Sequence, residues 1–268
     1  MDDIKARFIV RHPRCCFCGG KALTEERDEQ PPMTFFVERK WPKGYQFPAC
    51  ATCNRRSRLD DLVLGYVGRF FNPDESHIRD RDLERILYGI RNNLPELLPD
   101  LNPSTNEKRR ALRAMGIEKP QGVTYADLPM VGMSERVFEH VRSALRKLTC
   151  ALFYKHIDRI LPPDGALISA AEFNLAIADS KLAEELLPRL QHPTITRWNS
   201  EDISDQFCYR WTYDSALRAF VFLGLFAGAF VGLGCALETR ERLLTEELRN
   251  PWFDLGGKPV NVGDLMVC

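Results

Sequence analysis

Apolar side chains recur at a spacing of three and four residues in three stretches of this chain, a pattern typical of amphipathic helices. It predicts helices from residue 58 onward, over 79–93 and over 134–160. Ser134 is a residue type that caps helix starts, and Pro162-Pro163 would end the longest helix because proline cannot continue one. The middle of the chain is therefore expected to be largely helical.

A shorter helix is indicated by its first turn. Ser104 and Glu107 have the spacing of a capping box, and a basic run from Lys108 to Arg113 follows before Gly116. A run of this kind is most often a solvated helix face, and contact with phosphate is the alternative. Another helix is expected near 180–190.

Towards the C-terminus the hydrophobic period changes to two. Residues Phe207–Tyr213 mix aromatic and β-forming side chains as a strand does. Residues Ala219–Leu237 carry no charge over 19 positions, which is long enough to span a membrane. Glycines at four-residue spacing in this run fit helix pairing in membranes. Phenylalanines at even positions favour a buried β-hairpin instead, with a buried helix and a membrane span as the alternatives.

Composition places the chain among ordinary globular proteins. Of its 268 residues, 44% are hydrophobic and 28% are charged. These values exclude a wholly disordered, collagen-like or low-complexity chain, and this length can bury a core without disulfides. The sequence contains no glycine-rich phosphate loop, nucleophile elbow or dinucleotide-binding fingerprint.

The formal net charge is zero, because 37 basic residues balance 37 acidic ones. The balance hides an asymmetry. Residues 1–58 hold 12 basic and 7 acidic side chains, whereas residues 59–268 hold 25 and 30. A basic N-terminal part is compatible with contact to nucleic acid, which the total charge alone would argue against.

Cysteine spacing gives the clearest chemical signal. Cys15 and Cys18 form one CxxC pair, and Cys50 and Cys53 form a second pair after a gap of 31 residues. Each pair can place two thiolates at one turn, and four thiolates at about 2.3 Å complete a tetrahedral zinc site. Cys16 is expected to point away from this metal. Because four thiolates leave no open coordination position, the predicted zinc is structural.

The expected compartment follows from the first residues. The chain opens with the acidic Met1-Asp2-Asp3 and no apolar stretch follows, so we expect no secretory signal and a cytoplasmic protein. In that compartment clustered thiols bind metal rather than form disulfides. We expect no membrane association, because the apolar run Ala219–Leu237 is interpreted as buried. No pattern indicates an oligomeric state.

The segment between and after the cysteine pairs resembles a known superfamily. It reads Asp28-Glu29-Gln30-Pro31-Pro32, then Pro48-Ala49-Cys50, and finally Cys53-Asn54. Over about residues 12–65 this resembles the HNH endonucleases, in the bacterial and phage branch with an Asp-His-x-Pro-Pro segment. The resemblance implies a treble-clef or ββα-metal zinc module, with the second cysteine pair at the start of a helix.

The resemblance also implies a catalytic site for phosphodiester hydrolysis with one divalent cation, Mg²⁺ or Mn²⁺. Asp28 and Asn54 fall on metal-ligand positions of that site. Glu29 falls where the family has its general-base histidine, and the middle asparagine position falls near Lys43. A carboxylate with a pKa near its reference value of about 4.3 is a weaker base at neutral pH than histidine. Glu29 could instead serve as a second oxygen ligand.

Basic side chains near this site are candidates for contact with DNA phosphates: Lys43, Arg55, Arg56 and Arg58. The preferred hypothesis is a divergent HNH-like zinc protein that engages DNA, as an endonuclease with weakened or lost catalysis. The alternative is a catalytically inactive module that recognises a protein or nucleic-acid partner, for which phage–host conflict is a setting by analogy.

The predicted fold class is α+β. An HNH-like zinc module over residues 1–70 is expected to be fused to a larger mixed helical domain, residues 71–268, with a C-terminal antiparallel β-sheet. The sequence indicates no role for the larger domain.

Overall fold

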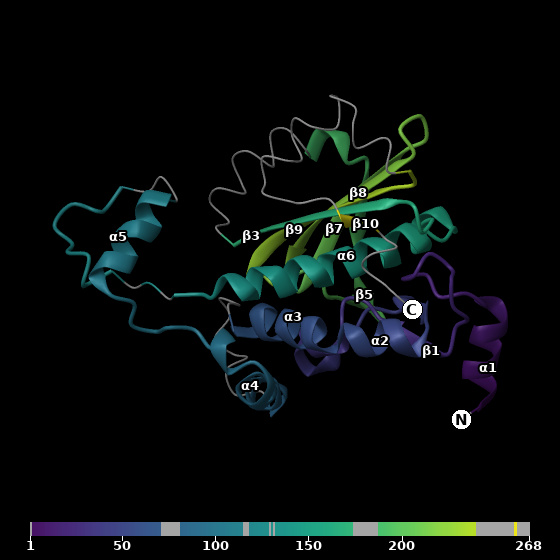
Figure 1. Cartoon of the computed structure of the whole chain (residues 1–268), viewed down its shortest axis with the longest axis horizontal. Helices are drawn as coiled ribbons and strands as arrows, with labels where there is room; N and C mark the ends of the chain where they lie inside the picture. Colours follow the sequence, from purple (N-terminus) through teal and green to yellow (C-terminus); the bar gives the residue numbers. More distant parts are fainter. Residues whose placement is uncertain are drawn as a thin grey trace.

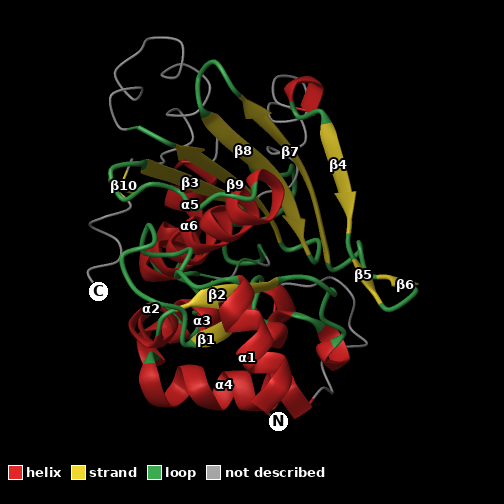
Figure 2. Ribbon diagram, turned by 90° about the vertical axis from the view of Figure 1, so that its right-hand side faces the viewer, coloured by secondary structure: helices red, strands yellow, loops and turns green. Residues whose placement is uncertain are grey.

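The computed structural model describes residues 2–70, 81–114, 118–128, 130, 132–173, 187–239 and 260–261. It has the α+β architecture expected from the sequence, with helices on one face of an antiparallel sheet (Figure 1). Seen from the side, the sheet, a long helix and the N-terminal elements form successive layers (Figure 2). The long helix therefore lies between the cysteine-rich part of the chain and the sheet.

The N-terminal part contains a short hairpin between helices. Its elements are α1 (Asp2–Arg11), β1 (Glu26–Glu29), η1 (Met33–Phe35), η2 (Val37–Arg39), β2 (Gln46–Ala49), α2 (Ala51–Arg56) and α3 (Arg58–Phe70). Strands β1 and β2 pair antiparallel, with Asp28 opposite Phe47. Only single helical turns lie between them, because the prolines of this segment prevent a longer helix.

The helices expected from the periodic pattern are confirmed. The elements are α4 (Arg81–Asn93), η4 (Pro95–Leu97), α5 (Thr105–Ala114), α6 (Glu135–Ile157) and η5 (Leu187–Arg189). The backbone nitrogen of Ser104 donates to Oε2 of Glu107 at 2.8 Å, and Glu107 N donates to Ser104 Oγ at 3.4 Å, so the capping box is formed. The helix expected near 180–190 lies outside the described residues, apart from the single turn η5.

Helix α6 begins and ends where the sequence indicates. Ser134 Oγ accepts a hydrogen bond from the backbone nitrogen of Arg136 at 3.3 Å, and Asp158 ends the helix in the left-handed conformation with φ 55°. Its buried side chains run from Val137 to Phe153 and include Val141 and Leu148. Burial of these side chains stabilises the helix far more than its capping does.

Six strands form the main sheet, in the spatial order β10-β3-β9-β8-β7-β4. Their bounds are β3 (Ala166–Glu172), β4 (His192–Ile195), β7 (Phe207–Asp214), β8 (Ala219–Phe226), β9 (Phe230–Leu237) and β10 (Val260–Asn261). All neighbouring strands are antiparallel. A separate two-stranded ribbon joins β5 (Arg197–Trp198) to β6 (Glu201–Asp202).

The uncharged run is the hairpin β8–β9, as the alternating phenylalanines predict. Ala219 lies opposite Leu237, and Phe226 lies opposite Phe230. Ala227 and Gly228 make the turn with φ values of 49° and 63°, the pair of left-handed residues that a type I′ turn requires. Among the described residues, no helix has the length and apolar character needed to cross a membrane.

Glycines of the hairpin allow α6 to lie close to the sheet. A Cβ atom at Gly232 would lie 2.7 Å from Cδ2 of Leu145, and one at Gly234 would overlap Oγ1 of Thr149. Both neighbours belong to α6. Of the three glycines at four-residue spacing, Gly232 therefore serves contact between a helix and a sheet, and Gly228 lies in the turn of the hairpin.

The apolar core is continuous between the cysteine-rich part and the sheet. The rings of Phe35 and Phe226 meet edge to face, with centroids 5.9 Å apart. The hydroxyl groups of Tyr45 and Tyr209 lie 3.0 Å apart in a buried hydrogen bond. Residues on both sides of position 70 thus contribute to one core.

Candidate metal centre

Cys15 and Cys18 lie in a tight turn that directly follows α1. The backbone nitrogen of Cys15 donates to the carbonyl of Ala22 at 3.0 Å, and Gly20 N donates back to the carbonyl of Cys15 at 3.1 Å. Gly19 and Gly20 both have positive φ, at 67° and 76°, which only glycine adopts without cost. A Cβ at Gly19 would also lie 2.8 Å from Cα of Pro163. The turn is therefore fixed by its own backbone and by a close neighbour.

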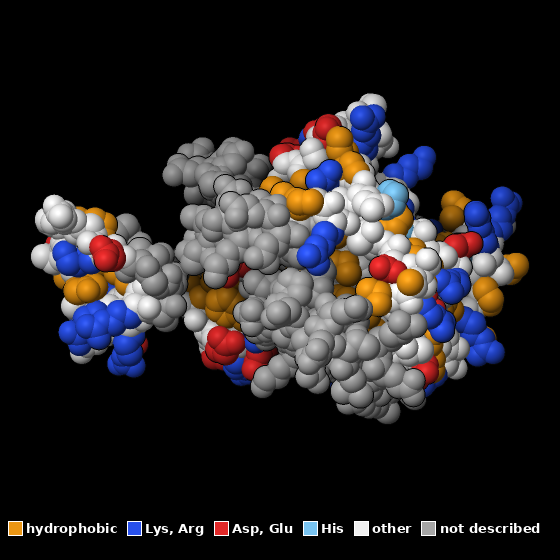
Figure 3. Space-filling model, turned by 90° about the horizontal axis from the view of Figure 1, so that it is seen from above, with side chains coloured by type: hydrophobic (Ala, Val, Ile, Leu, Met, Phe, Trp, Pro, Cys, Tyr) orange, Lys and Arg blue, Asp and Glu red, His pale blue; other side chains and the backbone are white. Residues whose placement is uncertain are grey.

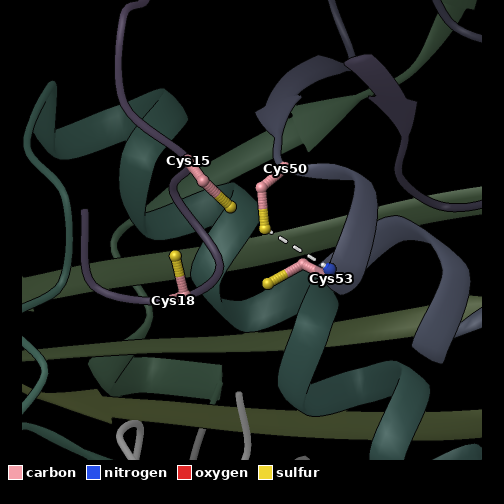
Figure 4. A group of neighbouring side chains, drawn as sticks. All are labelled: Cys15, Cys18, Cys50 and Cys53. Atoms are coloured by element: carbon pink, nitrogen blue, oxygen red, sulfur yellow. Dashed lines mark hydrogen bonds between the residues drawn. The ribbon is translucent and has the colours of Figure 1, made fainter. Parts of the chain in front are cut away.

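The second pair lies at the start of α2. Cys50 is the N-cap residue of this helix, and its Sγ accepts a hydrogen bond from the backbone nitrogen of Cys53 at 3.4 Å (Figure 4). Cys53 follows in the first helical turn. The positive end of the helix dipole and the backbone donor both favour the thiolate form here.

The four cysteines converge on one point. Their sulfur atoms all lie within 4.8 Å of one another, and all four side chains are buried. The sulfurs point towards each other from the turn and from α2 (Figure 4). In a tetrahedral zinc site the sulfurs are roughly 3.8 Å apart, as follows from bonds of about 2.3 Å. The cluster can hold a metal ion such as zinc.

The chemistry of the donors fits a cation. Without a cation in the cluster, hydrogen bonding with the Cys18 thiol, together with burial, raises the pKa of Cys15 to about 12. Crowded, buried thiols of this kind lose their protons only when a positive charge compensates them, which a divalent ion supplies. Cys16 is buried beside the cluster but is not one of the four, and burial raises the pKa of its thiol well above the usual range.

Asp28 does not face solvent. It points from β1 into the core, is 5% exposed, and its Oδ2 lies 2.7 Å from Nζ of Lys147 on α6. Nζ of Lys147 also lies 3.1 Å from Oδ2 of Asp61 on α3 and donates to the hydroxyl of Ser57. Gln30 Nε2 donates to Oδ1 of Asp28 at 3.2 Å. These five residues form a buried polar network around one ammonium group.

The pKa values of the three ionisable side chains in this network are all raised. Burial opposes the charge of Lys147, but Asp28 and Asp61 outweigh it and raise the pKa of the ammonium, so Lys147 stays positive. Burial raises the pKa of Asp28 to about 6, against the opposing effect of Lys147. The pKa of Asp61 is raised for the same reason. Two carboxylates facing one ammonium leave a net negative charge in the core, which is costly.

Glu29 and Asn54, the other two residues at the predicted catalytic positions, have different partners. Nδ2 of Asn54 donates to Oε2 of Glu26, which lies on β1 two residues before Asp28. Glu29 is half-buried, and burial raises the pKa of its carboxyl. Among the described residues, only the four cysteines form a cluster of metal-binding side chains, and neither Asp28 nor Glu29 belongs to it.

The basic candidates lie on the surface. Lys43 precedes β2, Arg55 and Arg56 lie in α2, and Arg58 begins α3; all four side chains are exposed. Arg55 Nε donates to the carbonyl of Ala51 at 3.2 Å. Figure 3 shows Lys and Arg side chains gathered at the end of the molecule that carries α1 and again around α5.

Lys147 is the residue that sequence reasoning missed. Its signal is a charged residue in the middle of the helix, three positions after Ala144 and four before Ala151, both of which are buried. A lysine on a buried helix face needs an acidic partner. The sequence does not say which carboxylate that is, because the partners lie 119 and 86 positions earlier in the chain.

Comparisons with protein-family models, with curated proteins and with solved structures find no match to this chain. The resemblance to HNH endonucleases therefore rests on the residues themselves. Of the features that it implies, the structure contains the tetracysteine cluster that can bind zinc.

Proposed function

We propose that this chain is a divergent HNH-like zinc protein that binds DNA and has lost the hydrolytic reaction of that superfamily. The observation that carries the proposal is the ion pair of 2.7 Å between Lys147 and Asp28. In the superfamily pattern, Asp28 falls on a ligand of the catalytic cation. Here an ammonium group supplies the positive charge next to this carboxylate.

For steric and electrostatic reasons, the ammonium group of Lys147 competes effectively with a divalent cation for Asp28. Mg²⁺ prefers six oxygen ligands and keeps several waters, so it needs an open, wet site. Asp28 is buried at 5% exposure, and Nζ of Lys147 already approaches both Asp28 and Asp61. A second cation beside the ammonium would be repelled. The site therefore favours a stable internal ion pair over a metal that must bind substrate.

One further feature supports lost catalysis. Glu29 replaces the histidine that would activate water, and a positioned general base contributes roughly 10²–10⁴-fold to such reactions. The bond that Nδ2 of Asn54 donates to Glu26 leaves Oδ1 of Asn54 open, so the loss rests on Asp28 and Glu29.

The tetracysteine cluster keeps a structural role in this proposal. Cys15, Cys18, Cys50 and Cys53 would hold one Zn²⁺ and fix the turn after α1 to the start of α2. Zinc bound by four thiolates supplies folding free energy and no open position for substrate.

Exposed arginines next to this centre favour DNA as the partner. Arg55 and Arg58 follow the metal ligand Cys53 within five residues, so the centre would hold their backbone rigidly. Guanidinium groups bind phosphate oxygens with two parallel hydrogen bonds. The excess of basic residues over positions 1–58 adds a favourable long-range field.

The proposal is tested by titrating the protein into a fluorescently labelled DNA duplex and following anisotropy at several salt concentrations. The double variant Arg55→Gln/Arg58→Gln should weaken DNA binding about tenfold or more at low salt. The slope of the logarithm of the binding constant against the logarithm of the salt concentration should become less steep by about one unit for each lost phosphate contact. Arg91→Gln, an exposed arginine on α4, is the matched control. Absence of DNA binding, or an equal effect of the control, would reject DNA and leave a protein-recognition module.

A further inference from the structure

A cavity of about 220 Å³ lies beside the metal centre, between the α2–α3 segment and α6. Its polar wall consists of Arg56, Ser57, Asp60, Ser143, Arg146 and Lys147. None of Asp28, Glu29 and Asn54 lines it. The cavity is therefore distinct from the three predicted catalytic positions, although Cys53 of the metal cluster and the DNA-contact candidate Arg56 both line it.

Three of the lining side chains are cationic, and one of these is already neutralised. Lys147 is paired with Asp28 and Asp61. The one acidic wall residue, Asp60, has its two oxygens 2.7 Å from Nδ1 of His140 and from the hydroxyl of Ser143, and it keeps its negative charge. The positive charge open to a ligand belongs to Arg56 and Arg146, against this one carboxylate.

Arg146 has an unmet need for an acceptor. Its Nε atom is buried and has no hydrogen-bond partner among the described residues. Its Nη1 makes one long hydrogen bond, of 3.5 Å, to the hydroxyl of Ser169. Burial lowers the pKa of Arg146, the charge of Asp60 opposes this effect, and Arg142 adds to it. A buried guanidinium donor without an acceptor is rare unless a ligand or water provides one.

Arg56 provides the second free cation. It lies at the end of α2, its side chain is exposed, and in the described part of the chain no ion pair or hydrogen bond engages its guanidinium. Two guanidinium groups on one small cavity form a site for an oxyanion, because each can donate two parallel hydrogen bonds.

We propose that this cavity binds a phosphate group, held between Arg146 at its buried end and Arg56 at its mouth. The volume of about 220 Å³ is below the range of roughly 300–1,000 Å³ that accommodates drug-sized ligands. It suits inorganic phosphate or a small phosphate monoester. Phe17 and Leu167 in the wall provide an apolar surface for a short organic group. The inference goes beyond the proposed function, since it requires neither DNA nor cleavage.

The test is isothermal titration calorimetry of the zinc-loaded protein in a phosphate-free buffer. One arm uses inorganic phosphate, a second uses phenyl phosphate, and a third uses a short DNA duplex without terminal phosphates. We expect one saturable site for phosphate, and tighter binding of phenyl phosphate would assign the site to organic monoesters. Arg146→Met should weaken phosphate binding at least about tenfold, the loss expected for a charged hydrogen-bonding partner.

Arg142→Met is the matched control, because Arg142 lies one turn earlier on α6 and pairs with Glu135 at 3.1 Å rather than with the cavity. It should leave phosphate binding unchanged. If Arg146→Met does not fold, as judged by circular dichroism, Arg56→Met at the exposed mouth gives the same test. No heat of binding at millimolar phosphate would overturn the proposal. So would equal losses in the control, or duplex binding that depends on Arg146.

Discussion

Nζ of Lys147 lies 2.7 Å from Oδ2 of Asp28, and both side chains are almost completely buried, at 2% and 5% exposure. The pair joins the middle of α6 to β1 of the N-terminal hairpin. A buried ion pair adds little net stability when it forms, but removal of one partner leaves an isolated charge in the core. The cysteine-rich part and the sheet-bearing part are therefore coupled electrostatically as well as through apolar contacts.

Removal of the ammonium should destabilise the protein strongly. We expect Lys147→Met to lower the free energy of unfolding by about 3–5 kcal/mol at neutral pH, because Asp28 and Asp61 would lose their counter-ion. Urea denaturation followed by circular dichroism measures this.

A second substitution distinguishes charge from packing. Asp28→Asn in the Lys147→Met background should recover a large part of the loss, since one uncompensated carboxylate is removed. If the double variant is as unstable as the sum of the two single variants, the pair does not interact as described.

Loss of a single thiolate should release the metal. We expect Cys53→Ser to bind much less than one zinc ion per chain and to unfold at a lower temperature, because metal binding and folding are linked. Metal analysis after gel filtration, with a thermal melt, checks both. Cys208→Ser on β7 is the control, since Cys208 lies outside the cluster. Equal zinc content in the two variants would show that Cys53 is not a ligand.

A side chain at Gly234 should force α6 away from the sheet. Gly234→Ala places a methyl group where Oγ1 of Thr149 and the ring of Phe222 already lie. Overpacking of this kind costs about 1–3 kcal/mol. Thermal unfolding should show the loss, and Thr149→Ala in the same chain should recover part of it. An unchanged melting temperature would mean that the helix is not seated as tightly as described.

Acid should destabilise the protein through His156. Nε2 of His156 lies 2.8 Å from the hydroxyl of Tyr209, and the ring stacks on Trp211 at 4.2 Å. Burial lowers the pKa of His156 to about 4, whereas the unfolded value is about 6.5. Between these two pH values the unfolded state binds more protons, so stability is lost as pH falls through this window.

Variants compared over the same pH range show whether His156 causes this loss of stability in acid. Urea denaturation from pH 7 to pH 4 should give a flatter stability profile for His156→Gln than for the wild type. His192 is exposed and also stacks on Trp211, and its charge is a minor cause of the low pKa of His156, so His192→Gln should flatten the profile much less than His156→Gln. Identical slopes in all three proteins would assign the acid sensitivity to other groups.

Local patterns in the sequence predict the elements well. The stripe of α6, the capping box at Ser104 and the alternating phenylalanines of β8 and β9 each reflect an interaction within a few residues. The two CxxC pairs predict the cluster because a tetrahedral ion imposes its own spacing. These patterns predict structure because the residues that interact follow a regular spacing along the chain.

Other features depend on the tertiary structure. The partner of Asp28 is 119 residues away, and nothing near Asp28 in the sequence indicates that its carboxylate turns inward. The spacing of Gly224, Gly228 and Gly232 supported only the alternative of a membrane span, and it does not predict that Gly232 makes room for Leu145 of α6. Contacts of this kind arise only when α6 packs against both neighbouring layers.

The most direct test is electrophoresis of supercoiled plasmid that has been incubated with the zinc-loaded protein and Mg²⁺ or Mn²⁺. Each sample is divided into two halves, and detergent removes the protein from one half before both are loaded. The account predicts retarded plasmid in the untreated half and fully supercoiled plasmid in the detergent-treated half, because the proposed function is DNA binding without cleavage. Open-circular or linear plasmid that Asp28→Asn abolishes would contradict it, as would plasmid that is never retarded.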